Sequence, residues 1–340
     1  MGLNNDSGIV IGKMKKGSKN LITDVEGIKV GHVTLDDGNI KTGVTAILPH
    51  EGNIYKEKVM ASSYVINGFG KSIGILQIEE LGNIETPIIM TNTLSIGTAT
   101  NALTKYMLAQ NKDIGSTTGT VNCVVTECND GKLNDIRGLH VREEHVFEAI
   151  RNADYVFEEG AVGSGTGMSC YGLKGGIGSS SRVIELDNKE YTLGALVMSN
   201  FGSIQDLNIN GDKIGERIAD TIKVEEDKGS IIIILAMDIP LNERQLKRVA
   251  KRSVIGLGRT GSHLGNGSGD ICIAFTTSNK IKHYCDTNIL EMKMVDDSII
   301  DKIFRAAIES VEEAVISSLF HADTTVGLNG FTRKSLKGYL

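Results

Sequence analysis

Residues 231–237 form one continuous apolar run, IIIILAM, directly after a glycine and a serine. An apolar run of this length without polar alternation is typical of a β-strand that is buried on both faces. Asp238 and Pro240 end the run, because proline lacks the amide hydrogen that a strand ladder needs. The chain is therefore expected to bury this strand between other layers of structure.

The segments after this run predict a helix, a second buried strand and a long closing helix. Asn242 is the expected cap of the first helix, and Leu246 and Val249 belong to its apolar stripe. The second strand is expected at 271–276 and the closing helix at roughly 297–320.

The first two thirds of the chain mix shorter strands with helices. Regular apolar spacing predicts helices at 94–108 and 144–157. Short apolar stretches bounded by Gly and Asp predict strands at 28–33, 44–48, 73–78, 88–90 and 121–126. Strands interrupted by helices in this way favour an α+β fold.

The chain has 340 residues, 40% of them apolar, which is enough for one large domain or two smaller ones. Residues 1–20 carry four lysines and no sustained periodicity, so we expect a loosely held N-terminal arm. No repeat and no Pro- or Ser-rich linker divides residues 21–340, which are expected to form a single domain. The most linker-like stretch is the polar segment KVEEDKG at Lys223–Gly229.

Charge and composition exclude several classes of function. Lys and Arg number 36 against 42 Asp and Glu, a formal charge of -6 that does not favour nucleic acid as a partner. No apolar stretch approaches the length of a membrane span, and five cysteines without a Cys-x-x-Cys pair favour a reducing cytoplasm. The seven histidines form no compact ligand set, so no metal is predicted.

Two glycine-rich motifs have competing interpretations. Gly256–Gly261 matches the dinucleotide pattern G-x-G-x-x-G, but it ends a predicted helix instead of joining a strand to a helix. Gly163–Gly178 is too rich in glycine for the interior of a helix or a strand. It either turns backbone N–H groups toward a ligand or forms a packed turn at the edge of a sheet.

Taken alone, Gly229-Ser230 is a loop that meets a strand. Over residues 22–331, however, the sequence resembles the L-aminopeptidase and D-alanyl esterase/amidase family, which includes the self-processing beta-aminopeptidases. The resemblance rests on eight blocks in the family's order: ITDVEGIKVGH (22–32), NGFGKS (67–72), ETPIIMTNTLSIGT (85–98), ECNDGKLNDI (127–136), GSGTGMSCYGLKGGIGSSSR (163–182), MSNFG (198–202), GSIIIILAMDIPL (229–241) and RTGSHLGNGSGD (259–270).

The resemblance implies a four-layer αββα sandwich, similar to that of N-terminal-nucleophile hydrolases but with altered connectivity. It also implies self-cleavage between Gly229 and Ser230, which would divide the single catalytic domain into an α chain (1–229) and a β chain (230–340). Ser230 would then be both the nucleophile and a new N-terminus. Because the ordinary pKa of an α-amine is about 7.7–8.0, the new amine can act as the general base for its own hydroxyl.

Other site residues follow from the same family motifs. Ser268 and Asp270 are expected beside the new amine, on one side of an extended segment because they are two residues apart. Asn200 is the expected oxyanion donor, the alternative being a turn residue after a strand. Cys128 is expected to line the pocket.

The resemblance therefore predicts a serine aminopeptidase or amidase that releases the N-terminal residue of short peptides, amides or esters. It predicts no cofactor and a homo-oligomer of processed αβ units. Two alternatives remain open. One is an acyltransferase of the ornithine acetyltransferase type, which resembles this fold and self-processes but uses Thr as nucleophile, so Ser230 argues against it. The other is an uncleaved, non-catalytic binding protein of the same fold.

Overall fold

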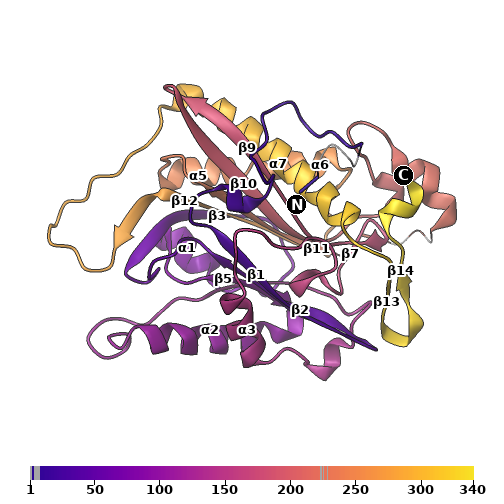
Figure 1. The fold of residues 1–340 in the computed structure, drawn as a ribbon, viewed down its shortest axis with the longest axis horizontal. Coiled ribbons are helices and arrows are strands. Elements are labelled where there is room, and N and C mark those ends of the chain that lie inside the picture. The colour runs from indigo at the N-terminus through magenta and orange to yellow at the C-terminus, as the bar shows by residue number, and fades with distance from the viewer. Residues whose placement is uncertain (1, 4–7, 223, 225, 228) are drawn as a thin grey trace.

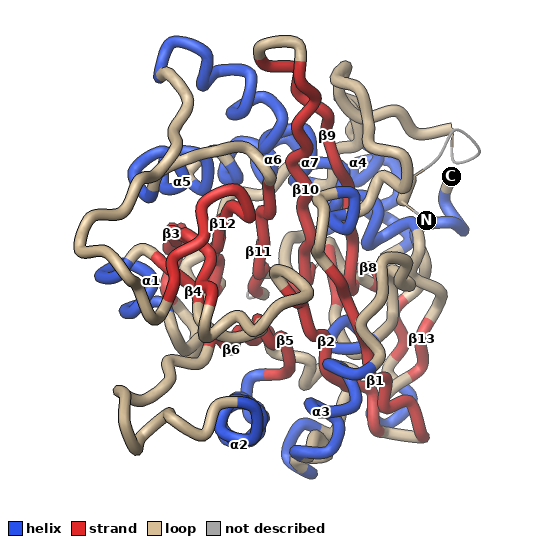
Figure 2. Tube along the Cα trace, turned by 60° about the vertical axis from the view of Figure 1, so that its left-hand side comes forward, coloured by secondary structure: helices blue, strands red, loops and turns tan. Residues whose placement is uncertain are grey.

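The computed structural model describes residues 2–3, 8–222, 224, 226–227 and 229–340 (Figure 1). Two β-sheets stack on each other, and helices cover the outer face of each (Figures 1 and 2). This is the α+β, four-layer αββα arrangement that the sequence predicts. In the part of the chain that is described, no helix has the length and apolarity needed to cross a membrane.

The smaller sheet has the strand order β1-β2-β5-β6 and is covered by α2 and α3. These elements come from the first half of the chain: β1 (Lys29–Asp37), β2 (Ile40–Leu48), β5 (Ile88–Asn92), α2 (Ile96–Gln110), β6 (Val124–Cys128) and α3 (Glu143–Arg151). The strands expected at 28–33, 44–48, 88–90 and 121–126 all lie here.

The larger sheet has the order β4-β3-β12-β11-β10-β9 and is covered mainly by α5 and α7, with α6 packed against α7. Its elements are β3 (Glu57–Gly68), β4 (Asn83–Ile84), β9 (Gly176–Leu186), β10 (Lys189–Asn200), β11 (Ser230–Met237), α5 (Glu243–Ala250), α6 (Ser253–Arg259), β12 (Gly269–Lys282) and α7 (Ile300–Phe320). The shorter elements are α1 (Ile75–Leu81), β7 (Ser169–Cys170), β8 (Leu173–Lys174), α4 (Ile214–Ile218), β13 (Thr325–Val326) and β14 (Thr332–Arg333).

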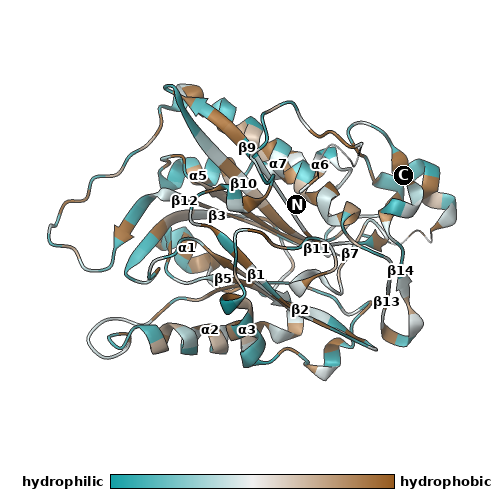
Figure 3. Ribbon diagram, viewed as in Figure 1, coloured by the Kyte–Doolittle hydropathy of each residue, from teal (hydrophilic) through white to brown (hydrophobic). Residues whose placement is uncertain are grey.

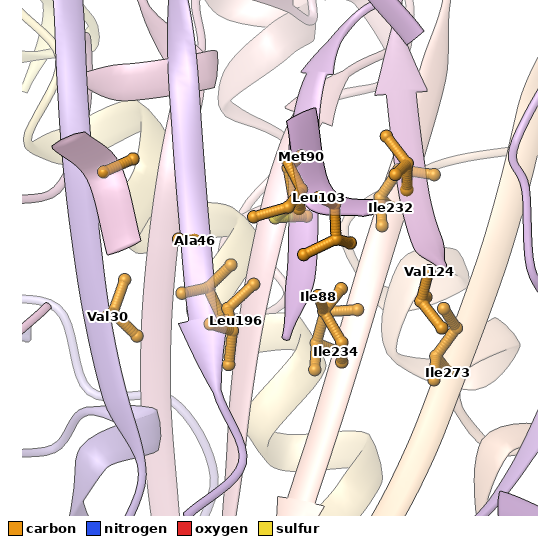
Figure 4. Close-up of a cluster of buried hydrophobic side chains, with 14 of the residues drawn as sticks. Val30, Ala46, Ile88, Met90, Leu103, Val124, Leu196, Ile232, Ile234 and Ile273 are labelled. Atoms are coloured by element: carbon orange, nitrogen blue, oxygen red, sulfur yellow. The ribbon is translucent and has the colours of Figure 1, made fainter. Parts of the chain in front are cut away.

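The run 231–237 is strand β11, and it separates the two hydrophobic cores. Successive side chains of a strand point to opposite faces, so Ile232 and Ile234 join the core between the sheets (Figure 4). Ile231 and Ile233 join the core between the larger sheet and its helices. Figure 3 shows the same apolar band along the central strands. The prediction of a strand buried on both faces is thus confirmed.

Two local expectations differ from the structure. The strand expected at 73–78 is instead helix α1, which begins after Gly74, where φ is +95° and the chain turns sharply. Ile78 of α1 is fully buried and Ile75 packs against the same core, and this separation of three residues fits a helix rather than a strand. The helix expected at 144–157 ends earlier, at Arg151.

The N-terminal segment is bound more firmly than the loosely held arm that we expected. Arg182 is completely buried and pairs with Glu309 at 3.1 Å and Glu313 at 2.6 Å, both on α7. Glu309 also accepts the backbone N–H groups of Lys13 and Met14 at 3.1 and 3.0 Å. The described residues of this segment are therefore tied to the closing helix by two glutamates.

Candidate active site

Ser230 is the first residue of β11 and lies at one end of the larger sheet. Across the antiparallel β10 its register partner is Asn200, the last residue of that strand. On the other side, the parallel pairing with β12 places Ile231 opposite Asp270. The Ser230 Oγ accepts a hydrogen bond from the backbone N–H of Gly269 at 3.0 Å and is largely buried. Sheet register thus brings three of the predicted residues together.

Asp270 is held by two donors on the same carboxylate oxygen. Its Oδ1 accepts the hydroxyl of Ser268 at 2.5 Å and the backbone N–H of Ile231 at 3.2 Å. Burial raises the pKa of Asp270 to about 6. Its Oδ2 is buried and has no hydrogen-bond partner among the described residues. A buried polar atom without a partner requires an explanation, and such atoms often mark a functional site.

The side-chain amide of Asn200 is fixed at both ends. Its Oδ1 accepts the backbone N–H of Ser169 at 2.9 Å, and its Nδ2 donates to the carbonyl of Asn129 at 3.0 Å. Because Nδ2 carries two hydrogens, one of them is left for another acceptor. Asn200 lies within the end of β10 and is not the turn residue of the alternative interpretation.

The glycine-rich segment Gly163–Gly178 carries Ser169, whose backbone N–H binds the Asn200 side chain. Lys174 is completely buried, and its Nζ donates to the carbonyls of Gly165, Met168 and Gly175 at 3.0, 2.9 and 2.6 Å. Burial lowers the pKa of this amine to about 7. The three bonds close the backbone around Lys174, and the N–H of Ser169 reaches Asn200. Contrary to expectation the segment also contains strands: β7 and β8 pair with each other, and β9 begins at Gly176.

Gly229 fits its position only because it has no side chain. A Cβ at this residue would overlap the carbonyl oxygen of Asn200 and lie 2.7 Å from the Cα of Phe201. Its N–H faces the Oδ1 of Asp227 at 3.4 Å. Of the predicted linker, Lys223, Glu225 and Lys228 lie outside the described residues.

A cavity of about 420 Å³ lies on the Gly229 side of Ser230, and Gly229, Asn200 and Asn129 are among the residues that line it. Cys128 does not line this cavity, contrary to expectation. It is completely buried behind Asn129, its Sγ faces the carbonyl of Met198 at 3.7 Å, and burial raises the pKa of its thiol well above the ordinary value. It is therefore not suited to be a nucleophile.

The histidines have contacts away from Ser230, Ser268 and Asp270. Each of the seven has a polar neighbour of its own, in the pairs His32–Thr45, His50–Glu57, His140–Asp135, His145–Arg142, His263–Asp206, His283–Thr118 and His321–Ser317. Within the described residues, no group of three or more His, Cys, Asp and Glu side chains is placed to hold a metal ion.

Sequence reasoning missed three backbone groups of this site. The N–H of Gly269, the N–H of Ser169 and the carbonyl of Asn129 bind Ser230 or Asn200. Backbone groups are present in every residue, so only the register of the strands and the course of the loops reveals them.

Comparison with known proteins gives a consistent result. Residues 20–333 match the model of Peptidase family S58. The chain is 38% identical over 347 residues to the beta-peptidyl aminopeptidase BapA of Sphingosinicella microcystinivorans, covering 95% of this chain and 86% of that protein.

Two solved structures are also similar over nearly their whole length. The PH0078 protein from Pyrococcus horikoshii OT3 is 55% identical, with a TM-score of 0.94, and the match covers 98% of this chain and 95% of that one. The L-aminopeptidase D-ala-esterase/amidase from Ochrobactrum anthropi, described as a new variant among the Ntn hydrolase fold, is 37% identical, with a TM-score of 0.92 and coverage of 98% and 94%.

Proposed function

The chain belongs to peptidase family S58 and is a hydrolase of the aminopeptidase and amidase type, and from this premise we propose that Ser230 is its nucleophile. We propose further that the enzyme cuts its own Gly229–Ser230 bond to expose this residue. The names of its relatives support short peptides, β-peptides among them, as substrates.

One observation carries the proposal. The Ser230 hydroxyl, the Asn200 amide and the Ser268–Asp270 pair meet at the end of β11, where the chain has a glycine on the other side of the bond to be cut. Acyl transfer to serine needs a nucleophile, a base and a donor to the oxyanion, and the buried carboxylate is suited to stabilise the amine that serves as base after the cut.

In the precursor, the Ser230 Oγ attacks the carbonyl carbon of Gly229. The C–N bond breaks, the nitrogen of Ser230 takes up the hydroxyl proton, and the Gly229 acyl group is left as an ester on Oγ. Water hydrolyses that ester and gives residues 1–229 with a new carboxylate and residues 230–340 with a new amine. Asn200 would donate its remaining N–H to the oxyanion of each tetrahedral intermediate.

In turnover, the freed amine accepts the proton of its own hydroxyl while Oγ attacks the substrate carbonyl. Asp270 is next to Ile231, so its Oδ2 is a partner for the amine that processing creates. The ionised carboxylate stabilises the ammonium form that follows proton uptake, and Ser268 keeps the carboxylate oriented. The C–N bond of the substrate breaks, the leaving amine takes up the proton, and the released residue is left as an ester on Oγ. Water then hydrolyses this ester and restores the Ser230 hydroxyl.

The proposal includes no cofactor and takes the processed αβ units to assemble as a cytoplasmic homo-oligomer, which the family resemblance supports. The relatives are peptidases, so hydrolysis is favoured over acyl transfer. An uncleaved protein that only binds its ligand is the alternative that an experiment has to test.

We expect the purified protein to run on a denaturing gel as two fragments instead of one band at 36.5 kDa. Intact mass spectrometry should assign them to residues 1–229 and 230–340, and the processed sample should hydrolyse aminoacyl amides and p-nitroanilides. A single full-length band without hydrolysis of any of these compounds would contradict the proposal.

We expect kcat/KM of the processed enzyme to rise with pH as the Ser230 amine loses its proton, because only the neutral amine accepts the hydroxyl proton. The ionised Asp270 carboxylate favours the ammonium form of this amine, so it shifts the rise toward higher pH. The measurement is a pH profile for single replacements of the seven histidines.

His263→Asn is the critical variant in this series, because His263 lines a second cavity whose wall also includes Asp227, the residue that binds the N–H of Gly229. His145→Asn on α3 is its matched control. If any single histidine replacement abolishes the alkaline rise in a folded, processed protein, the amine is not the base.

A further inference from the structure

The cavity beside Gly229 lies on the acyl side of the bond to be cut. Its lining includes Asn200 and three residues that come before Ser230 in the chain, Glu226, Asp227 and Gly229. Under the proposed function, the same nucleophile and the same oxyanion donor act in processing and in turnover. The residue that a substrate loses must therefore occupy the space that the chain before Ser230 occupies in the precursor.

The charged side chains that line this cavity come from two parts of the chain. Among the described residues of the lining, the body of the protein contributes two cationic side chains, Lys132 and Arg333, and no carboxylate. The carboxylates among the described lining residues are those of Glu226 and Asp227, which belong to the segment before the cut. The precursor thus places acidic side chains where the released residue of a substrate would lie.

Arg333 is held in a fixed position in the wall. Its side chain is buried, Nε donates to the hydroxyl of Ser169 at 3.1 Å, and Nη1 donates to the carbonyl of Gly172 at 3.1 Å. The guanidinium also lies 4.8 Å from the ring centroid of Phe331. Because the N–H of Ser169 binds the Asn200 amide, Arg333 and the oxyanion donor are fixed by the same residue.

The cavity also offers a backbone donor that already binds a carboxylate. The N–H of Gly202 donates to the Oδ1 of Asp227 at 2.8 Å. A backbone N–H, a buried guanidinium and a lysine at the exposed edge together match the donors that proteins use for carboxylates. In turnover the same donors would face the released residue of a substrate.

We propose that this cavity selects substrates whose released N-terminal residue carries a carboxylate, namely aspartyl or glutamyl peptides, amides and esters. This specificity rests on the proposed function of Ser230. Arg333 and Gly202 hold the side-chain carboxylate, and Lys132 adds positive charge at the mouth of the cavity.

The test compares isosteric pairs of p-nitroanilides on the processed enzyme: Asp against Asn, and Glu against Gln, with Ala as the reference. We expect kcat/KM to be about 10- to 100-fold higher for each acid than for its amide, the range of one hydrogen bond to a charged group. Added NaCl should reduce this ratio, because salt screens charges at the cavity mouth.

Lys132→Gln should lower the Asp/Asn ratio of kcat/KM several-fold. Lys112→Gln, which removes an exposed lysine just after α2 and outside this cavity, is the matched control and should keep the wild-type ratio. Arg333→Lys should lower the ratio further, provided that its circular dichroism and melting temperature show a folded protein.

The outcomes separate the two proposals. If the processed enzyme hydrolyses Ala- and Asn-p-nitroanilides at least as fast as the Asp compound, the specificity is wrong and the proposed function stands. An Asp/Asn ratio that is unchanged in Lys132→Gln also overturns the role of the cationic lining. A protein that stays uncut and hydrolyses none of the compounds overturns the proposed function and the specificity with it.

Discussion

Ser230→Ala is expected to give an uncut, folded and inactive chain of 36.5 kDa. The hydroxyl that attacks Gly229 in processing and the substrate in turnover is the same atom, so its loss stops both reactions. The substitution removes one oxygen, which accepts a hydrogen bond from the Gly269 N–H. It therefore changes little of the packing around β11.

The measurements are a denaturing gel, intact mass and hydrolysis of aminoacyl p-nitroanilides, with a thermal melt to show that the variant is folded. Ser310→Ala is a suitable control, because this buried serine lies on α7 and its hydroxyl has no hydrogen-bond partner among the described residues. It should process normally. Cleavage before residue 230 in the Ser230→Ala protein would remove Ser230 from the role of nucleophile.

Asp270→Asn is expected to lower kcat by orders of magnitude while processing continues at least in part. The amine exists only after the cut, so a carboxylate that orients it matters chiefly for turnover. Asparagine keeps an oxygen that can accept the Ser268 hydroxyl and the Ile231 N–H, but it cannot stabilise an ammonium by charge.

The stability of the Asp270→Asn variant distinguishes lost chemistry from lost folding. Burial raises the folded-state pKa of Asp270 from 3.8 to about 6, so this group favours the folded state at low pH and that contribution is lost as the pH rises through 6. Above pH 6 the neutral asparagine should therefore not destabilise the fold through this burial. Asp238→Asn, at another partly buried aspartate with a raised pKa, is the control and should keep wild-type turnover. Wild-type kcat in fully processed Asp270→Asn protein would contradict the role of Asp270.

The strands that could be predicted from the sequence are those that consist of an uninterrupted run of apolar residues. Strand β11 and the long helix α7 are observed close to their expected positions, whereas β12 was expected only at 271–276 and extends to Lys282. Strands β3, β9 and β10 were not predicted. Strand β9 explains why: at Gly178 a Cβ would overlap the carbonyl of Ala314 on α7, and the Ser180 hydroxyl donates to the carbonyl of Ser310 at 2.7 Å.

A strand packed this closely against a helix needs glycine and serine on that face, and in sequence those residues resemble a loop. The site could likewise be predicted only in part from the sequence. The family motifs point to Ser230, Ser268, Asp270 and Asn200 separately, but only strand register places them side by side. Their partners in the backbone and the charge of the cavity depend on segments distant in sequence, such as strand β14, which carries Arg333.

The strand order of the larger sheet has a consequence for the enzyme after it is cut. Strands β11 and β12 lie between β10 and β3, so the proposed β chain would be wedged between two parts of the α chain, with hydrogen bonds along both sides. The two chains would separate only by opening the centre of the sheet, which amounts to unfolding. Folding of the precursor is a reaction of one molecule, whereas refolding of the cut enzyme requires two chains to meet and depends on their concentration. The processed enzyme would therefore resist separation into its two chains, but after denaturation it would refold less readily than the precursor.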